Sequence, residues 1–378
     1  MNWEYVTLDK LGSVSRGRSK HRPRNDKALF GGKYPFVQTA DVKAAELYLT
    51  DYTETYNERG LEQSKLWKAG TLCITIAANI ADTAILGIDA CFPDSVMGFI
   101  PFEGVSNVKF VKYAFDILQR DCQKISQGTA QDNLSWKKLS TINFPAPPIE
   151  IQNKIVDILS VYDDLIENNK KQIKLLEETA QRLYKEWFVD LRFPGYEDVD
   201  IVDGVPDGWR KANLSEISPI VTGKKDANFG TTDGKYLFFT CAQEPIKAPS
   251  FSFDCDAVIL AGNGDFNVKL YRGQFEAYQR TYVFSPYNSE YLYLLYYAVK
   301  ENMRQLFQGA SGSTIKFLTK RMLEEILVFV PDEKMLELFN QNCELLQKKI
   351  EALKAQISLA QEARERLLPK LMSGEIEV

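Results

Sequence analysis

A cluster of arginines and lysines near the start of the sequence is its clearest chemical feature. Seven cations lie between residues 16 and 33 and are opposed only by Asp26. Glycines and prolines among them indicate a flexible loop. Such side chains bind phosphate oxygens, and arginine also pairs with guanine, so the cluster predicts contact with nucleic acid; the alternative is a solvated loop. Its members are Arg16, Arg18, Lys20, Arg22, Arg24, Lys27 and Lys33.

Two polar stretches and a second, shorter basic segment offer further contacts to DNA. Glycines in the polar stretches allow close backbone approach, and amide side chains can pair with adenine, although ordinary turns would explain either stretch alone. The candidates are Gln127, Thr129 and Gln131 in the first stretch and Gln308, Ser311, Ser313, Thr314 and Lys316 in the second. The shorter basic segment holds Lys224 and Lys225, which Lys269, Arg272 and Arg280 can supplement.

The sequence shows no catalytic constellation. Its single histidine, His21, lies in the basic segment without a cysteine cluster, which argues against a zinc site or a histidine-based triad. There is no phosphate-binding loop motif, and the GxG at residues 262–264 is more simply a tight turn. The prolines at residues 145–148 lack the order of a methyltransferase tetrapeptide. We therefore expect no catalytic residue, no metal and no cofactor.

Composition limits the classes of protein that remain. The chain has 378 residues, which suits two or three domains, and its net charge of −5 excludes a globally basic surface. The six cysteines form no CxxC pair, as in reduced thiols of a cytosolic protein. No apolar run reaches 18 residues and no signal peptide begins the sequence. These features predict a cytoplasmic protein without a membrane segment.

The elements that must position these residues are dominated by a long helix. Apolar residues between 147 and 188 recur at alternating steps of four and three, the heptad pattern of a coiled coil. A helix over 151–188 would be about 57 Å long and would act as a spacer. The acid pairs Asp163-Asp164 and Glu177-Glu178 are interpreted as its solvated face. The seam comprises Ile155, Leu159, Tyr162, Ile166, Ile173, Leu176 and Leu183, with Asn169 as a polar member.

A second helix with the same pattern closes the sequence. Adding 184 to each residue number maps the first seam onto the second, from Ile155 on Phe339 to Leu183 on Leu367. This constant offset predicts an internal repeat, the alternative being two unrelated helices. The second seam includes Leu346, Ile350, Leu353, Ile357 and Leu367, with Arg364 as a charged member.

The segments before the two helices also resemble each other, beginning at Trp3 and Trp209. The offset falls from 206 at these tryptophans to 184 at the helices, so the first segment holds about 22 more residues, which we expect in loops. Short β-rich runs at 72–76, 236–240, 257–260 and 277–284, with helical stretches at 113–121 and 291–307, predict mixed α/β (α+β) domains. Glycines, prolines and acids make 193–209 a predicted linker.

Two copies of one unit favour a pseudo-twofold arrangement with antiparallel long helices. We therefore predict a first domain at 1–147, a long helix at 148–190, a second domain at 191–331 and a second long helix at 332–378. Each globular domain would lie at one end of the helix pair, a shape that suits a ligand with two separated half-sites.

At this point the sequence resembles the specificity subunits of type I restriction–modification systems. The resemblance rests on the helix start Pro147-Pro148-Ile149-Glu150-Ile151-Gln152, on the helix end Leu183-Tyr184-Lys185-Glu186-Trp187-Phe188, and on Leu367-Leu368-Pro369-Lys370-Leu371-Met372. The second helix start, Pro331-Asp332-Glu333-Lys334-Met335, departs from the family's glutamine-containing form.

The resemblance implies a non-catalytic subunit with two target recognition domains held apart by two antiparallel helices. Each domain would read one half of a bipartite sequence in double-stranded DNA. The helices would dock two methyltransferase subunits, and the complex could also recruit a translocating nuclease subunit. The main alternative is a coiled-coil adaptor that joins proteins without touching DNA. A self-contained DNA-modifying enzyme is a weaker alternative, because the sequence lacks a methyl-donor motif.

Overall fold

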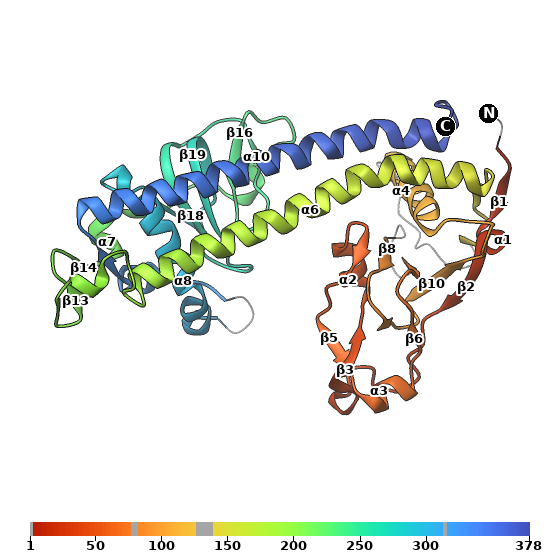
Figure 1. Ribbon diagram of the computed structural model, residues 1–378, viewed down its shortest axis with the longest axis horizontal. Helices are drawn as coiled ribbons and strands as arrows, with labels where there is room; N and C mark the ends of the chain where they lie inside the picture. The colour runs from red at the N-terminus through yellow and green to blue at the C-terminus, as the bar shows by residue number, and fades with distance from the viewer. Residues whose placement is uncertain (1–2, 77–81, 126–138, 313–315) are drawn as a thin grey trace. The chain divides into compact units, whose positions relative to one another are not determined.

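The computed structural model describes residues 3–76, 82–125, 139–312 and 316–378 (Figure 1). The chain divides into two compact units: unit 1 comprises residues 1–169 and 355–378, and unit 2 comprises residues 170–354. Two helices of 40 residues each, α6 (Ile149–Phe188) and α10 (Glu333–Met372), contribute to both units.

Unit 1 is a mixed α/β unit around a five-stranded sheet. Its helices are α1 (Leu8–Leu11), η1 (Lys27–Leu29), α2 (Thr39–Ala44), α3 (Glu58–Glu62) and α4 (Val108–Ile125). Its strands are β1 (Tyr5–Thr7), β2 (Gly12–Arg16), β3 (Phe30–Phe36), β4 (Tyr48–Leu49), β5 (Glu54–Tyr56), β6 (Leu66–Trp67), β7 (Leu72–Thr75), β8 (Thr83–Leu86), β9 (Ala90–Cys91), β10 (Val96–Pro101) and β11 (Asn143–Pro145).

The five-stranded sheet of unit 1 has the order β2-β10-β7-β8-β4, and only the edge strand β4 is parallel to its neighbour. Strands β7 and β8 are buried along their whole length, which explains their continuous apolar and β-branched runs. A smaller sheet has the order β5-β3-β9-β6, and β1 pairs with β11 directly before α6. The core joins sheet and helices through Leu72, Phe99, Phe110, Ile155, Leu159 and Leu371.

Unit 2 is also mixed α/β. Its helices are η3 (Tyr196–Asp198), α7 (Leu214–Ile217), η4 (Ala227–Phe229), η5 (Ser289–Tyr291), α8 (Leu292–Gly309) and α9 (Lys320–Glu324). Its strands are β12 (Ile201–Val202), β13 (Val205–Pro206), β14 (Arg210–Asn213), β15 (Ile220–Thr222), β16 (Tyr236–Phe239), β17 (Ile246–Ala248), β18 (Phe253–Ala261), β19 (Val268–Ala277), β20 (Thr281–Phe284) and β21 (Leu327–Val330).

The main sheet of unit 2 has the order β15-β20-β18-β19-β16-β17, and only β16 and β19 pair in parallel. Its first five strands therefore follow the same pattern as the five-stranded sheet of unit 1. In both units a strand pair, β1–β11 or β14–β21, adjoins a four-residue helix, and an 18-residue helix, α4 or α8, packs beside the sheet.

The additional residues of unit 1 are not simply loops, as the sequence had suggested. By its place in the sheet β4 corresponds to β16; between β2 and β4 the chain forms η1, β3 and α2, whereas unit 2 has only η4 between β15 and β16. Phe36 in β3 is 6% exposed and Val42 in α2 is 1% exposed, because these additional elements carry apolar residues that join the core. The inserted segment is therefore an integral part of unit 1.

The seam residues of the long helices are buried or half-buried in the structure. Ile155, Leu159, Ile166, Ile350 and Leu353 are buried, whereas Tyr162, Ile173, Leu176, Leu183, Leu346, Ile357 and Leu367 are half-buried. Within unit 1, the first half of α6 packs on the last turns of α10. Within unit 2, the end of α6 packs on the start of α10, where the rings of Phe188 and Phe339 lie 4.8 Å apart.

One prediction about the first long helix is wrong. Asp163 does not lie on a solvated face: it is 5% exposed and accepts a hydrogen bond from the Tyr113 hydroxyl of α4. The Nη1 atom of Arg364 lies 2.5 Å from its other carboxylate oxygen. A buried carboxylate is tolerable here because a cation and a hydroxyl satisfy it. Asp164, its neighbour, is exposed as predicted.

The predicted linker at 193–209 is also wrong in its central point. Phe193 and Trp209 are buried in unit 2 with ring centroids 4.5 Å apart, and the short strands β12 and β13 pair between them. The glycines and prolines mark turns inside the unit rather than a free connection. The predicted strand at 277–284 is interrupted as well, because residues 278–280 form the turn between β19 and β20.

Candidate nucleic-acid interface

The basic segment of unit 1 begins where β2 crosses the turn before β10. A Cβ atom on Gly17 would lie 2.2 Å from the carbonyl oxygen of Pro93, so only glycine fits this crossing. The Gly17 amide donates to the Val96 carbonyl over 2.8 Å, and the Arg18 amide donates to the Phe92 carbonyl over 3.1 Å. This crossing fixes the point from which the cations project.

Residues 17–26 form a loop, as the sequence predicted, and further hydrogen bonds anchor it. The side-chain oxygen of Gln63 accepts from the amides of Lys20 and His21, at 2.7 and 3.1 Å. The Ser64 hydroxyl donates to the Arg18 carbonyl over 2.8 Å. All six basic residues from Arg16 to Lys27 are exposed, so the backbone is held while the charged ends face solvent.

Asp26 is not the only acid near these cations, contrary to the sequence interpretation. Arg24 pairs with Asp94 at 2.8 Å, and Lys33 lies 3.6 Å from Glu58. Asp26 accepts from the Ala28 amide and from His21, and these hydrogen bonds lower the pKa of its carboxyl. Within the described part of the chain, acidic side chains form no ion pair with Arg16, Arg18, Lys20 or Lys27.

Arg22 has a structural task besides its charge. Its Nη1 atom donates to the carbonyls of Ser19 and His21, at 2.7 and 2.8 Å. Replacing Arg22 would therefore disturb the segment itself, whereas Arg18 can be replaced without losing such a side-chain bond.

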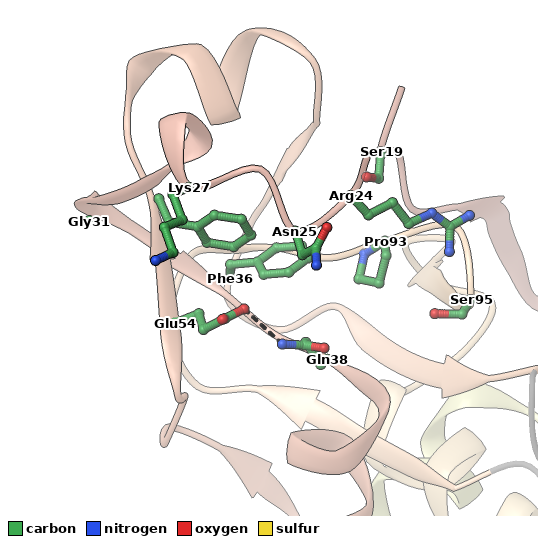
Figure 2. Close-up of a pocket in the computed structure, with 11 residues that line it drawn as sticks. Ser19, Arg24, Asn25, Lys27, Gly31, Phe36, Gln38, Glu54, Pro93 and Ser95 are labelled. Atoms are coloured by element: carbon green, nitrogen blue, oxygen red, sulfur yellow. Dashed lines mark hydrogen bonds between the residues drawn. The ribbon is translucent and has the colours of Figure 1, made fainter. Parts of the chain in front are cut away.

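A cavity of about 710 Å³ opens beside this segment (Figure 2). The segment contributes Arg24, Asn25 and Lys27, and the β3–β5 region contributes Phe30, Gln38 and Glu54. The Gln38 side chain donates to a carboxylate oxygen of Glu54 over 2.8 Å, and the Gln38 amide donates to Asp41 at the start of α2. The cavity thus combines cations, an amide, a carboxylate and an aromatic wall.

Unit 2 has a crossing like that of Gly17. A Cβ atom on Gly223, which follows β15, would lie 1.9 Å from the Ala277 carbonyl. Lys224 and Lys225 come next; Lys224 is exposed, and the Lys225 carbonyl accepts from the Gln279 amide over 2.9 Å. Arg280, in the same turn, is exposed as well. The structure thus brings the predicted Lys224–Lys225 pair and Arg280 to one end of the sheet.

The three supplementary cations of unit 2, Lys269, Arg272 and Arg280, differ in their contacts. Arg272 pairs with Glu344 at 3.2 Å and with Asp256 at 3.5 Å, so two acids offset its charge. Lys269 donates to the Ala242 carbonyl over 2.9 Å, and burial lowers the pKa of its ammonium. Of the three supplementary residues, Arg280 alone presents an exposed side chain without such a contact in the described part of the chain.

The polar stretches can be placed only in part. Gln127, Thr129, Gln131, Ser313 and Thr314 lie outside the described residues. Gln308 belongs to the last turn of α8 rather than to a loop, and Ser311 pairs with Phe317 through two backbone hydrogen bonds. Lys316 donates to the Phe307 carbonyl over 3.1 Å, so its ammonium also closes the end of α8.

Sequence reasoning missed Gln38 and Glu54, which line the cavity of unit 1. Neither belongs to a charge cluster or a motif, so nothing in the local sequence marks them. In the part of the chain that the structure describes, no three His, Cys, Asp or Glu side chains are placed to share a metal ion. The described helices also include none with the length and apolarity needed to cross a membrane.

Comparison with known proteins gives a consistent result. Residues 1–178 match the model of the type I restriction modification DNA specificity domain. The EcoDI specificity subunit of Escherichia coli is 36% identical over 178 residues, covering 46% of this chain and 39% of that subunit. The MjaIX specificity subunit of Methanocaldococcus jannaschii is 24% identical over 416 residues, covering 100% of this chain and 94% of that subunit.

The fold of the chain is also similar to that of a solved structure. The S subunit of a type I restriction–modification system from M. genitalium matches with a TM-score of 0.57 at 18% sequence identity, over 98% of this chain and 96% of that one. At this identity the match concerns the fold alone. Residues 1–178 therefore belong to the family of type I restriction modification DNA specificity domains, and the chain is similar to specificity subunits of type I restriction enzymes.

Proposed function

We propose that the chain is the DNA-recognition and scaffold subunit of a type I restriction–modification complex. Its recognition domains comprise residues 1–147 and 191–331, and each reads one half of a bipartite target in double-stranded DNA. The helices at 148–190 and 332–378 pair as an antiparallel coiled coil and relate the two domains by a pseudo-twofold axis.

One observation carries this proposal: exposed cations occupy the same structural position in both units. In each unit a strand reaches a glycine that is pressed against a neighbouring carbonyl, Gly17 in unit 1 and Gly223 in unit 2. Arg18 and Lys20 follow the first glycine, and Lys224 follows the second. Cations repeated on a shared scaffold suit a ligand that presents phosphates at two places, as duplex DNA does.

Contacts inside each unit support the antiparallel helix pair. In unit 1, Asp163 pairs with Arg364, and the Asn169 side chain donates to Gln356 over 3.1 Å. Residue numbers therefore rise along α6 as they fall along α10. In unit 2, the end of α6 meets the start of α10 through Phe188 and Phe339. Both units follow the same direction of pairing.

In this proposal the chain recognises DNA and its partners carry out the chemistry. The long helices dock two methyltransferase subunits, and a nuclease subunit joins complexes that also cleave. The complex acts in the cytoplasm of a prokaryote. This division of labour is supported by the relatives of the chain, which are named as specificity subunits.

The test is a methylation map of the chain reconstituted with its methyltransferase subunits. We expect methylation at one bipartite sequence. Arg18→Ala should weaken DNA binding and lower the salt dependence by about one phosphate contact, because it removes one cation and no hydrogen bond that holds the segment. Lys68→Ala is the matched control, since Lys68 already pairs with Asp89 at 2.7 Å. Methylation without sequence preference would refute the proposal.

A second experiment tests the helices as a spacer. Four residues inserted between Lys174 and Gln181 lengthen α6 by roughly 6 Å and act as a tolerated coiled-coil insertion. Both half-sites should stay unchanged, while the unread spacer between them grows by about one or two base pairs. A single inserted residue rotates the apolar stripe by about 100° and should impair assembly instead. An assembled four-residue variant that keeps the original spacer would exclude this architecture.

A further inference from the structure

The cavity of unit 1 contains a charge that phosphate binding does not explain. Arg24 and Lys27 contribute positive charge to the cavity, and Glu54 contributes a carboxylate beside Gln38 (Figure 2). Glu54 is exposed at the start of β5. A carboxylate repels phosphate oxygens, so an acid here weakens any contact with the DNA backbone. Glu54 must therefore face a different part of the ligand if this surface meets DNA.

The donors that a carboxylate can find on DNA are few. An ionised carboxylate only accepts hydrogen bonds. In the major groove the donors are the exocyclic amino groups of adenine and cytosine, whereas guanine and thymine present acceptors at the corresponding positions. An acidic side chain among cations therefore selects between bases, while the cations bind any sequence.

Gln38 holds Glu54 in place for this task. The Gln38 side chain donates to one carboxylate oxygen over 2.8 Å, and its backbone amide is fixed by Asp41 over 2.7 Å. The neighbouring Phe36 is buried and stacks on Tyr56 with ring centroids 4.1 Å apart, so β3 and β5 are packed together beneath this pair. Among the described residues, Gln38 is the one hydrogen-bond donor to Glu54, which leaves its second oxygen available.

The two cations of the cavity, Arg24 and Lys27, differ in whether an acidic side chain already pairs with them. Arg24 is held by Asp94 at 2.8 Å, whereas Lys27 has no ion pair in the described part of the chain. Lys27 is therefore the cation of this cavity that is available to a phosphate.

We propose that Glu54 is a specificity-determining residue of the first recognition domain and accepts a hydrogen bond from the exocyclic amino group of adenine or cytosine. Gln38 is its positioning residue, and Lys27 binds a phosphate beside the base that is read. This inference rests on the proposed function, because it assigns to the cavity one base within the half-site that unit 1 reads.

The experiment uses the complete complex of the chain with its methyltransferase subunits. Binding is measured on a set of duplexes in which each base pair of the wild-type target is changed in turn. Glu54→Gln keeps the shape of the side chain but adds an amide donor. The variant complex should therefore tolerate any of the four bases at the one position that Glu54 reads. We expect discrimination at that position to fall by about five- to a hundredfold, as for the loss of one good base contact.

The remaining variants separate this role from a structural one. Gln38→Ala should relax the same position more weakly, because Glu54 stays but moves. Lys27→Ala should weaken binding to every duplex alike and lower the salt dependence. Glu62→Gln, on the exposed end of α3 and outside the cavity, should change neither quantity.

The possible failures point to different errors. If Glu54→Gln folds, binds and discriminates like the wild-type chain at every position, the assignment of Glu54 is wrong while DNA recognition stands. The assignment would also be refuted if a base analogue that lacks the exocyclic amino group at the relaxed position were bound by the wild-type complex as tightly as the natural base. If the wild-type complex itself shows no preferred sequence, the proposed function fails.

Discussion

Helix α4 of unit 1 and helix α8 of unit 2 both press a tyrosine against a long helix, yet the groups around the two tyrosines differ. Tyr113 donates to the buried carboxylate of Asp163, which also binds Arg364. Adding 184 to the number of Tyr113 gives Tyr297, which is 2% exposed and lies 6.2 Å from the ring of Phe339. An ionic network in one unit is matched by an apolar contact in the other.

Unit 2 has its own network of the same three chemical types, but at different positions. The Tyr293 hydroxyl donates to Glu344 over 2.6 Å, and Arg272 of β19 pairs with the same carboxylate at 3.2 Å. Glu344 corresponds to Ser160 by the offset of 184, and Ser160 accepts from Lys109 over 3.0 Å. The repeat preserves which faces are buried, whereas each copy satisfies its polar groups in its own way.

Replacing Arg364 should cause the largest loss of stability among the substitutions that test this difference between the units. Burial acts against its charge, but the hydrogen bond and charge of Asp163 outweigh that effect and raise the pKa of the guanidinium. Arg364→Ala leaves Asp163 buried without its cation and should cost about 3 to 5 kcal/mol of unfolding free energy. Urea unfolding of the purified chain measures the change.

Arg366→Ala is the matched control on the same helix. Arg366 pairs with Glu362 at 2.5 Å, but its side chain is 77% exposed. Exposed pairs contribute about 0 to 1 kcal/mol. Equal effects of the two substitutions would show that the Asp163 network adds nothing beyond an ordinary surface pair.

The starts of the two long helices form a second contrast. Gln152 is 1% exposed in α6; its side chain donates to the carbonyls of Val105 and Pro147 and accepts from the Asn107 amide, all at 2.9 Å. It thereby holds the turn before α4. The corresponding residue of α10 is Leu336, which is 3% exposed in an apolar core. The second helix start lacks the glutamine, and in the structure an apolar contact of Leu336 takes the place of the hydrogen bonds of Gln152.

Gln152→Leu should destabilise unit 1, because it leaves two carbonyls and one amide without their buried partner. The expected loss is about 1 to 3 kcal/mol. Hydrogen exchange of the Asn107 amide is the direct readout and should accelerate as the turn before α4 opens. Leu338→Gln, at a partly exposed position of α10, is the control and should leave Asn107 unchanged. Unchanged exchange in Gln152→Leu would mean that the turn is held by other contacts.

The long helices could be predicted from sequence because their signal is local. Apolar steps of three and four predicted a helix over 151–188, and α6 spans Ile149–Phe188. Ile173 and Ile357, expected in a buried seam, are only half-buried, so Ile166 is the better seam position to perturb. Periodicity identifies the face that turns inward but not the depth of each residue.

The networks and the cavity could not be predicted, because their members meet only in the fold. Asp163 and Arg364 are 201 residues apart, and an aspartate on a polar helix looks solvated until its partner is known. Phe193 and Trp209 were assigned to a linker because glycine and proline signals dominate that stretch. Glu54 and Gln38 meet through strand pairing and the start of α2, which residue spacing does not encode.

The smallest expected change in stability comes from replacing Glu344. This change should depend on pH, because it follows the ionisation of the Glu344 carboxyl in the network of unit 2. The hydrogen bond from Tyr293, together with Arg272, lowers the pKa of the Glu344 carboxyl below its ordinary value of 4.5, although burial acts in the opposite direction. A lowered folded-state pKa contributes stability above pH 4.5, and this contribution is lost as the pH falls through the folded-state value. At neutral pH the ionised carboxylate of Glu344 therefore makes its full contribution to the free energy of unfolding.

Glu344→Gln should accordingly lose stability at pH 7 and approach the wild-type chain as the pH falls through the folded-state pKa of Glu344, because the wild-type carboxyl then becomes protonated as well. Urea unfolding of the purified chain at each pH measures the difference in stability. Glu351→Gln is the control, since that carboxylate is exposed on α10 and accepts only from Gln347 in the described part of the chain. Its unfolding curves should run parallel to those of the wild-type chain across this pH range. A difference for Glu344→Gln that stays constant from pH 7 to pH 3 would show that the carboxylate acts by its shape rather than by its charge.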